Sequence, residues 1–503
     1  MKNNIKIKLY NDEMWYSGCI DDTINMPYTI NSNVKFDATK SDSYNEVNPI
    51  LISSKGRYVA ALDYFVYEFK NVELIVNSDY KLDSGEKETF VEAYNYIKNT
   101  YYSFNKKHPF MRLFTSPQYC SWMELNKYIN QNSLIEYAKS IIDAKLDPGE
   151  LIIDDGWEDY YGQYAFSKKK FPNPKGMIEI LNELGFFVTV WMTPYIFLDT
   201  PSFNELKEKD LLIKNENDEI FICTWWEGKS ACIDLSNPNA IKWLNLKLDA
   251  LKKLGVKGFK LDGGDSRIYK DNLKCYDKSI KSACDIAEVY GKFAANFDVS
   301  EIRSTCKCGG LPVMQRIADR YHCWEDINNG FDGIVKKSLV MSMFGYPYNC
   351  PDMIGGGQID DIEKNKLIDK ELVVRYIQAA TLMPSWQFSR AIWKDKYFKE
   401  IILSMNNIRK SFNNELEKAV IKCANDGTLI IKPMIYFNNK ADDLNQFILG
   451  DNIFVAPVLK KNQFEKEITL PDGIWEYGYD HKLYKGKVLV KTPLEILPYF
   501  IKK

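Results

Sequence analysis

The residues best suited to chemistry are carboxylates that follow short apolar runs. Asp262 comes after Gly258 to Leu261, and Asp154 and Asp155 come after Leu151 to Ile153. In a (β/α)8 barrel, the residues that do chemistry lie at the C-terminal ends of the strands. An Asp followed by Gly is also common in turns, so Asp262 could instead cap the next helix. Both interpretations of this stretch stay open from the residues alone.

Histidine is too scarce to support most alternative chemistries. The 503 residues contain only His108, His322 and His481, so a Ser-His-Asp triad or a His-rich zinc site would have to be built from very few groups. Cys306 and Cys308 form one close pair, but no second close pair accompanies them, and no metal site is predicted. The chemistry is therefore expected to depend on carboxylates. Cleavage of a glycosidic bond needs two carboxyl groups. The aromatic content, with 11 Trp and 32 Tyr residues, suits contact with the flat faces of sugars.

The elements around Asp262 resemble one strand–helix unit of a barrel. In the run from 237 to 254, Ala240, Leu244, Leu248 and Leu251 fall at helical spacing, and a glycine at 255 stops the helix. The run from 106 to 410 alternates strands and helices, which predicts a barrel of parallel strands. Its expected strands end near 114–117, 151–153, 186–191, 258–261, 311–319, 339–345 and 382–388.

Two all-β regions flank this alternation. Residues 1–105 show short alternating strands separated by turn residues, which predicts an N-terminal β-sandwich with no chemical motif of its own. Residues 106–410 form the predicted (β/α)8 TIM barrel, and residues 411–503 form a C-terminal β-sandwich domain. The predicted fold class is thus α/β, with a barrel between two β domains.

Composition excludes several classes of protein. A net charge of −2 argues against a nucleic-acid-binding protein. No apolar run approaches the roughly 18 residues that a membrane span needs, and the first residues lack the apolar core of a secretory signal. Eleven cysteines, an odd number and mostly within apolar runs, suit a reducing compartment. We therefore expect a cytoplasmic protein with a small-molecule partner, either as a monomer or as a homo-oligomer.

Six motifs, in order along the chain, resemble those of glycoside hydrolase family 31. They span roughly residues 110 to 460 and are Phe171-Pro172-Asn173-Pro174-Lys175-Gly176-Met177-Ile178, Val190-Trp191-Met192-Thr193-Pro194-Tyr195-Ile196, Asp234-Leu235-Ser236-Asn237-Pro238, Phe259-Lys260-Leu261-Asp262, Asp352-Met353-Ile354-Gly355-Gly356, and Leu449-Gly450-Asp451-Asn452-Ile453-Phe454-Val455-Ala456-Pro457-Val458. The resemblance implies the same three-part architecture that the strand and helix patterns predict.

The resemblance also implies catalytic roles. Asp262 corresponds to the family's nucleophile, in a reaction that retains the α configuration. The family usually presents its acid/base in a Trp-x-Gly-Asp string, which this chain lacks. Asp319 is favoured for the acid/base because it lies 16 residues after Arg303, a spacing like that in the family. Asp326, within Trp324-Glu325-Asp326, is the alternative. Either carboxyl is expected to need a raised pKa, so that it is protonated when the leaving oxygen departs.

Around the −1 sugar, the resemblance implies a substrate-binding set of Asp154, Asp155, Trp191, Trp225, Lys260, Arg303 and Asp352. Taken one at a time, however, Trp157, Trp191 and Trp226 are each more typical of a core than of a ligand site. No cofactor is implied, because glycosyl transfer through two carboxylates needs neither a metal nor a redox partner.

Departures from the family pattern bear on the substrate, an oligosaccharide or another α-glycoside. Gln387-Phe388-Ser389-Arg390 replaces the His-Ser-Arg string of many α-glucosidases. Together with Gly345-Tyr346-Pro347, it resembles the branch that contains the myogenesis-regulating glycosidase and bacterial α-galactosidases. A retaining, exo-acting α-galactosidase is therefore favoured. The alternatives are an α-glucosidase, an α-xylosidase, an α-N-acetylgalactosaminidase, a transglycosylase or a non-catalytic sugar-binding protein.

Overall fold

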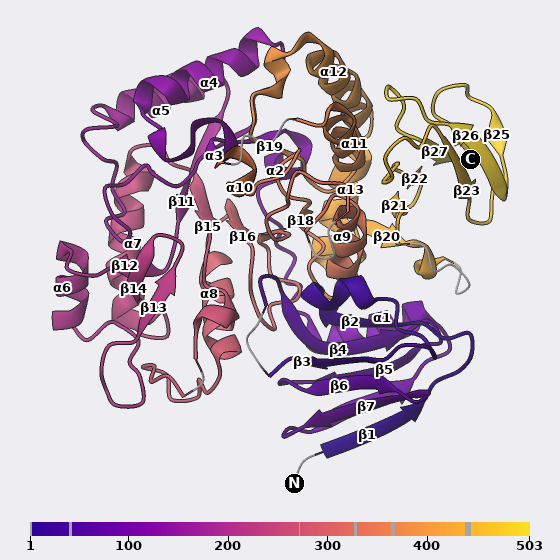
Figure 1. The fold of residues 1–503 in the computed structure, drawn as a ribbon, viewed down its shortest axis with the longest axis horizontal. Helices are drawn as coiled ribbons and strands as arrows, with labels where there is room; N and C mark the ends of the chain where they lie inside the picture. Colours follow the sequence, from indigo (N-terminus) through magenta and orange to yellow (C-terminus); the bar gives the residue numbers. More distant parts are fainter. Residues whose placement is uncertain (1–2, 40–42, 271, 326–328, 364–367, 438–443) are drawn as a thin grey trace.

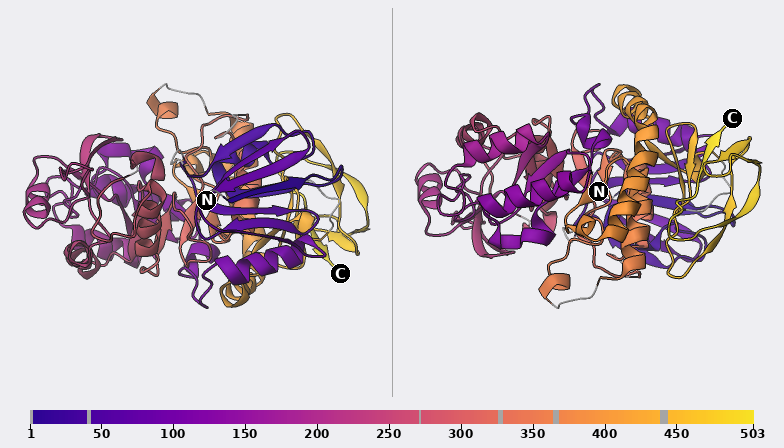
Figure 2. Two further views of the ribbon diagram at one scale, coloured as in Figure 1. Left: turned by 90° about the horizontal axis from the view of Figure 1, so that it is seen from below. Right: turned by 90° about the horizontal axis from the view of Figure 1, so that it is seen from above.

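The computed structural model describes residues 3–39, 43–270, 272–325, 329–363, 368–437 and 444–503. It contains an N-terminal pair of antiparallel sheets, a central barrel covered by helices, and C-terminal sheets (Figure 1). Both views in Figure 2 place the N-terminal and C-terminal strands on the same side of the barrel. This confirms the predicted fold class.

Eight parallel strands form the barrel, in the order β18-β17-β16-β15-β11-β10-β9-β19. A parallel bridge between Met353 and Gln387 closes the ring, and the Ile354 N–H donates to the Gln387 carbonyl at 2.7 Å. The strands are β9 (Gln118–Cys120), β10 (Glu150–Ile153), β11 (Phe187–Met192), β15 (Gly258–Leu261), β16 (Ser300–Ile302), β17 (Met314–Arg316), β18 (Asn349–Cys350) and β19 (Gln387–Phe388).

Polar and apolar side chains alternate along β15, so its polar groups all lie on one face of the strand. Side chains of a strand point to opposite faces in turn, so Lys260 and Asp262 share one face while Phe259 and Leu261 share the other. Phe259 packs edge-on against Phe297, with ring centroids 5.0 Å apart. The apolar face thus contacts the surrounding elements, and the polar face is left for the interior and mouth of the barrel.

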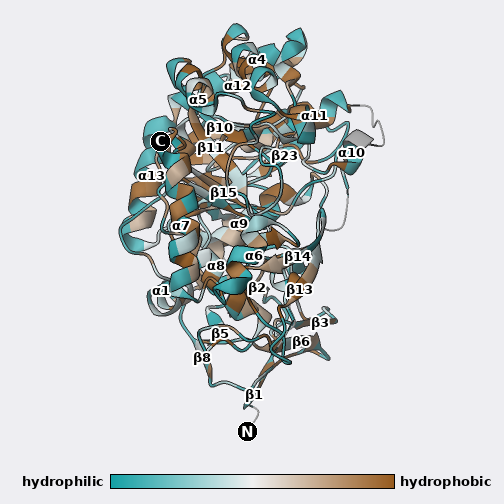
Figure 3. Ribbon diagram, turned by 90° about the vertical axis from the view of Figure 1, so that its left-hand side faces the viewer, coloured by the Kyte–Doolittle hydropathy of each residue, from teal (hydrophilic) through white to brown (hydrophobic). Residues whose placement is uncertain are grey.

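Amphipathic helices cover the barrel, with hydrophilic residues mainly outward (Figure 3). In α7 (Pro238–Lys253), the Asn237 side chain caps the N-terminus, and the predicted residues Ala240, Leu244, Leu248 and Leu251 are buried. The other helices of the described chain are α1 (Phe90–Tyr101), α2 (Arg112–Thr115), α3 (Trp122–Leu125), α4 (Gln131–Asp143), α5 (Pro174–Glu183), α6 (Pro201–Glu208), α8 (Ala283–Ala294), α9 (Gly333–Met343), α10 (Asp360–Glu363), α11 (Lys370–Thr381), α12 (Lys396–Ser411) and α13 (Asn413–Asp426). Within the described residues, no helix is both long and apolar enough to cross a membrane.

Two strand predictions were wrong. The run 114–117 was expected to end the first strand, but Phe114 and Thr115 lie in α2 and the strand begins at Gln118. The run 339–345 was expected to be a strand, but most of it lies in α9, which is almost wholly buried. A helix that is apolar all round has no amphipathic period, so a short window of it resembles a buried strand.

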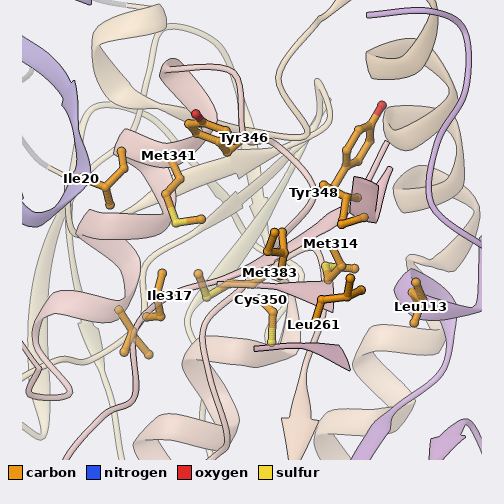
Figure 4. Close-up of a cluster of buried hydrophobic side chains, with 14 of the residues drawn as sticks. Ile20, Leu113, Leu261, Met314, Ile317, Met341, Tyr346, Tyr348, Cys350 and Met383 are labelled. Carbon is orange, nitrogen blue, oxygen red and sulfur yellow. The ribbon is translucent and has the colours of Figure 1, made fainter. Parts of the chain in front are cut away.

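The N-terminal part consists of two four-stranded antiparallel sheets that share one buried core. Their orders are β1-β7-β6-β3 and β2-β4-β5-β8. The strands are β1 (Asn3–Lys8), β2 (Trp15–Cys19), β3 (Val34–Asp37), β4 (Val47–Ser53), β5 (Arg57–Ala61), β6 (Val66–Lys70), β7 (Glu73–Ser78) and β8 (Leu82–Glu86). Core packing continues into the barrel, where Ile20 lies near Met341 of α9 (Figure 4).

The C-terminal part contains a six-stranded sheet, β20-β21-β22-β27-β24-β25, and a two-stranded sheet, β23-β26. Arg375 of α11 ties it to the barrel by donating to the Thr492 carbonyl at 2.6 Å. The strands are β20 (Ile431–Pro433), β21 (Phe447–Leu449), β22 (Ile453–Val455), β23 (Glu465–Thr469), β24 (Trp475–Tyr477), β25 (Leu483–Tyr484), β26 (Lys487–Lys491) and β27 (Tyr499–Lys502).

Two connections out of the barrel matter for the site. A small antiparallel sheet follows β11 and is formed by β12 (Tyr195–Phe197), β13 (Ile222–Trp225) and β14 (Gly228–Cys232). The link from β16 to β17, residues 303–313, is fully described and forms no helix. Instead, it pairs with the N-terminal part through a bridge between Val47 and Cys306.

Candidate active site

A cavity of about 510 Å³ opens at the C-terminal ends of the barrel strands. It brings together eight of the predicted site residues from widely separated parts of the chain. These are Asp154, Asp155, Trp191, Trp225, Lys260, Asp262, Arg303 and Asp319. The carboxylates that follow β10 and β15 therefore share one cavity, as expected for neighbouring parallel strands.

Asp262 is held as a carboxylate. Its Oδ1 accepts hydrogen bonds from Arg303 Nε at 3.1 Å and from the Gly263 N–H at 2.9 Å, and its Oδ2 accepts from Trp191 Nε1 at 3.1 Å. Burial opposes ionisation, but the charges of Arg303, Arg316 and Lys260 outweigh it and lower the pKa of Asp262 well below its usual value. The side chain is still 19% exposed to the cavity. Asp262 is thus ionised and accessible, and its side chain does not cap a helix.

Arg303 connects Asp262 to the walls around it. Besides its bond to Asp262, its Nη1 lies 3.1 Å from Asp265, which is fully buried. The same nitrogen donates to the Tyr44 carbonyl at 3.4 Å. Burial disfavours the charge of Arg303, but Asp265 and Asp262 raise its pKa well above the usual value. Arg303 therefore orients the Asp262 carboxylate through the planar guanidinium group.

Asp319 lies in the same cavity, beside Arg316. Nη1 of Arg316 donates to the Asp319 carboxylate at 2.5 Å, and Asp319 keeps 34% of its side chain exposed. The expectation of a raised pKa is wrong for Asp319. Burial raises the pKa of Asp319, but Arg316 and Arg303 outweigh it and lower the pKa below its usual value, against repulsion from Asp262.

Asp352 was expected to contact substrate, but the structure places it beneath the cavity lining. It is fully buried and accepts hydrogen bonds from Arg316 Nη1 at 2.8 Å and from the Arg320 N–H at 2.8 Å. Burial raises the pKa of Asp352 to about 6, against the attraction of Arg316. In this arrangement, Asp352 supports Arg316.

Asp154 and Lys260 form a buried pair at the deep end of the cavity. Lys260 Nζ lies 2.7 Å from Asp154 Oδ2, and the two side chains are only 4% and 5% exposed. Cys120 also donates its S–H to Asp154 Oδ2 at 3.0 Å. Burial disfavours the charge of Lys260, but Asp154 and other acids outweigh it, so the pKa of Lys260 lies well above its usual value. A fixed carboxylate of this kind can accept hydrogen bonds from sugar hydroxyls.

Asp155 belongs to the aromatic wall. Its Oδ2 accepts from Tyr161 OH at 2.7 Å and from Trp226 Nε1 at 3.1 Å. Burial raises the pKa of Asp155 to about 6. The rings of Trp191 and Trp225 lie nearly parallel with centroids 6.1 Å apart, and both line the cavity, which gives it an aromatic surface. Such a surface suits the apolar face of a pyranose ring.

The expected core position is correct for Trp157 but not for Trp226. Trp157 is fully buried and donates to the Trp191 carbonyl at 2.8 Å, so its expected core role is confirmed. Trp226 was also expected in the core, but it lines the cavity and is 44% exposed. The position of Trp226 in the turn of the β13–β14 hairpin explains its exposure, because a turn projects from its sheet.

Other cavity residues were missed by sequence reasoning. Arg316 lies three positions before Asp319, so the string Arg316-Ile317-Ala318-Asp319 gave a detectable signal. Tyr44 and Arg267 gave no such signal in the sequence. Tyr44 belongs to the N-terminal part, and Arg267 belongs to a short turn after β15. The N-terminal part was expected to carry no chemistry, yet Tyr44 lines the cavity.

Two sequence expectations have no counterpart in the described site. Asp326, the alternative acid/base, lies outside the described residues. Within the residues that the structure does describe, no group of three or more His, Cys, Asp or Glu side chains could hold a metal ion.

Comparison with protein families identifies the barrel and the C-terminal part separately. Residues 115–306 match the model of the glycosyl hydrolases family 31 TIM-barrel domain. Residues 427–503 match the model of the glycosyl hydrolase family 31 C-terminal domain. The chain belongs to glycoside hydrolase family 31. The first match includes Asp154, Trp191, Asp262 and Arg303, and it ends before Asp319.

Several relatives in family 31 are detectably similar over much of the chain. The myogenesis-regulating glycosidase of Mus musculus is 27% identical over 81% of this chain and 57% of its own length. The α-xylosidase XylQ of Lactiplantibacillus pentosus is 37% identical over 64% of this chain and 43% of its own. The chain thus spans about half the length of these relatives.

A solved family 31 structure has the same fold. A mutant of the GH31 dextranase of Flavobacterium johnsoniae, complexed with isomaltotriose, superimposes with a TM-score of 0.85 at 17% identity. The superposition covers 100% of this chain and 66% of the dextranase.

Proposed function

We propose that this chain is a retaining, exo-acting α-glycosidase that works by double displacement, with Asp262 as nucleophile and Asp319 as acid/base. The observation that supports it best is the ionised Asp262 carboxylate, which is aimed into a cavity that also contains the exposed carboxyl of Asp319. Retaining glycosidases need this division of roles between two carboxyl groups.

In the first step, Asp319 gives its proton to the glycosidic oxygen while Asp262 attacks the anomeric carbon. The bond to the leaving group breaks, and a glycosyl ester with Asp262 forms. In the second step, Asp319 takes a proton from water, the water oxygen bonds to the anomeric carbon, and the Asp262 carboxylate is released.

The charges around Asp319 suit this exchange of roles. Asp262 repels a charge on Asp319 and so offsets part of the lowering of the Asp319 pKa by Arg316 and Arg303. Esterification removes the charge of Asp262, so the pKa of Asp319 falls further when it must act as a base. Protonation before the first step is favoured because a bound sugar excludes water from the cavity.

The proposed −1 subsite lies at the deep end of the cavity. Asp154, fixed by Lys260 and Cys120, accepts bonds from sugar hydroxyls, and Trp191 and Trp225 form the wall beside the ring. Because this end is buried, it receives the terminal sugar of a chain, which accounts for exo action.

The preferred substrate in this proposal is an α-galactoside. The support is the resemblance of the motifs at 345–347 and 387–390 to the α-galactosidase branch, together with the similarity to the myogenesis-regulating glycosidase. An α-xyloside is the second candidate, because an α-xylosidase is 37% identical over 64% of the chain.

The test is release of nitrophenol from aryl α-galactoside, α-xyloside, α-glucoside and α-N-acetylgalactosaminide. Wild type is compared with Asp319→Ala and Asp326→Ala, each with and without azide. We expect α-galactoside cleavage, lost in Asp319→Ala and rescued by azide, because a small anion can replace water at the glycosyl ester without base assistance.

Each other outcome has a defined meaning. Rescue of Asp326→Ala instead would move the acid/base role to Asp326 and leave the nucleophile unchanged. If only another glycoside of the panel is cleaved, that glycoside replaces the α-galactoside as the proposed substrate. Binding of a sugar without cleavage of any substrate would contradict the enzymatic proposal and favour a sugar-binding protein.

A further inference from the structure

The charged groups that line the cavity form three ion pairs, which leave one cation and the Asp155 carboxyl outside a pair. Lys260 pairs with Asp154, Arg303 with Asp262, and Arg316 with Asp319. The remaining lining cation is Arg267, in the short 3-10 helix η3 (Ser266–Ile268). Among the described residues, the Arg267 guanidinium forms no ion pair or hydrogen bond, its buried Nε has no partner, and its charge acts on the buried Asp265 only at longer range.

The Arg267 guanidinium is nevertheless held in place. Its Cζ lies 3.8 Å from the centroid of the Tyr44 ring, a cation–π contact between the barrel and the N-terminal part. The Tyr44 N–H in turn donates to Asp21 at 2.6 Å, and the Tyr44 carbonyl accepts from Arg303. A guanidinium stacked by its face keeps its N–H donors at the edge, where they can receive a planar anion.

Exposure separates the two ends of the cavity. The Asp154–Lys260 pair at the deep end is about 5% exposed, whereas Tyr44 is 46% exposed. The sugar that is attacked by Asp262 occupies the deep end in the proposed function. The leaving group must therefore extend toward the open rim, where Tyr44 and Arg267 lie.

We propose that Arg267 and Tyr44 form a leaving-group subsite that selects aglycones carrying an anionic group, such as a carboxylate, sulfate or phosphate. Tyr44 supports the flat part of the aglycone and fixes the guanidinium, and Arg267 donates hydrogen bonds to the anion. This proposal rests on the proposed function for the orientation of the substrate. The N-terminal part thus contributes to selectivity through one side chain.

The test uses two aryl glycosides of the sugar that the nitrophenyl panel selects, or of galactose if it selects none. One carries a 4-carboxyphenyl leaving group and the other carries the neutral 4-carbamoylphenyl group. The ratio of their kcat/KM values is measured in wild type, Arg267→Gln and Tyr44→Leu. Lys270→Gln is the matched control, because it removes an exposed cation three residues away.

We expect wild type to favour the carboxylate, and Arg267→Gln to lower the ratio by about tenfold, as for loss of one charge-assisted hydrogen bond. Tyr44→Leu should lower the ratio by a smaller factor, and Lys270→Gln should leave it within about twofold of wild type. The preference should also weaken as salt is added.

Three outcomes would overturn the proposal. An equal ratio in wild type and Arg267→Gln would show that Arg267 does not select the leaving group, while hydrolysis would still support the proposed function. A preference for an anionic C6 substituent on the glycone that depends on Arg267 would place the anion on the sugar and not on the leaving group. If nothing is hydrolysed, the proposed function fails, and the subsite is then tested by calorimetric binding of the same two glycosides, where equal affinities would overturn it.

Discussion

Nη1 of Arg316 donates hydrogen bonds to the carboxylates of both Asp319 and Asp352. Nε of the same guanidinium donates to Glu301 at 3.1 Å. The proposed acid/base is therefore attached to a buried cation that three carboxylates share. Its protonation depends on Arg316 as directly as on its own burial.

Replacing Arg316 should move the pH dependence of catalysis. In Arg316→Gln, loss of the cation raises the pKa values of both Asp319 and Asp262, which Arg316 lowers in wild type. The basic limb of kcat/KM, set by the acid, and the acidic limb, set by the nucleophile, should both shift upward, by about one pH unit. The measurement is the profile of kcat/KM against pH.

Arg316→Lys is the companion variant because it retains the charge in a smaller side chain. It should keep both limbs near their wild-type positions, even if kcat falls. A downward shift in Arg316→Gln, or equal shifts in both variants, would contradict electrostatic control by Arg316.

Asp262→Asn should abolish turnover without loss of the fold. The amide retains the shape and the bond from Trp191 but cannot form the glycosyl ester, so kcat should fall by roughly 10⁴-fold or more. Calorimetry should still detect sugar binding. Asp249→Asn, an exposed change on α7, serves as the control. Turnover that survives in Asp262→Asn would show that Asp262 is not the nucleophile.

Lys260→Met should destabilise the protein strongly. It leaves the buried Asp154 without its cation, and removal of one partner of a buried pair costs about 3–5 kcal/mol of unfolding free energy. Urea unfolding monitored by tryptophan fluorescence would measure this loss. The control is Lys257→Met, an exposed position just before β15. Equal stability of the two variants would show that Asp154 does not depend on Lys260.

Glu158 should make stability depend on pH. Burial raises its pKa from 4.5 to about 8, although its Oε2 accepts from the Tyr164 N–H at 2.8 Å. The folded state therefore binds a proton that the unfolded state has lost, so this contribution to stability is complete below pH 4.5 and is lost as pH rises toward 8. The slope is at most about 1.4 kcal/mol per pH unit.

Glu158→Gln imitates the protonated acid and should remove this part of the slope. Its unfolding free energy should exceed that of wild type at pH 8 and approach it at pH 5. Glu183→Gln, an exposed change on α5, should leave the slope unaltered. Parallel stability curves for wild type and Glu158→Gln would contradict a protonated Glu158.

Most of the architecture, and the kinds of chemistry open to the chain, could be predicted from the order of the amino acids. Regular spacing of Ala240, Leu244, Leu248 and Leu251 predicted α7, and an apolar run that ends in Asp262 predicted a barrel strand with an acid at its mouth. These features are local, because helix and strand periods are written in neighbouring residues. Predictions failed where neighbouring residues show no amphipathic period, as in the almost wholly buried α9.

The pairing of the charges, in contrast, depends on contacts that form when distant parts of the chain fold together. Asp352 was expected at the sugar, but folding places it under Arg316, and folding also joins Lys260 to Asp154 and leaves Arg267 stacked on Tyr44. These partners lie 36, 106 and 223 positions apart in the chain. A pKa depends on distances through space, so the lowered pKa of Asp319 could not be derived from the sequence around it.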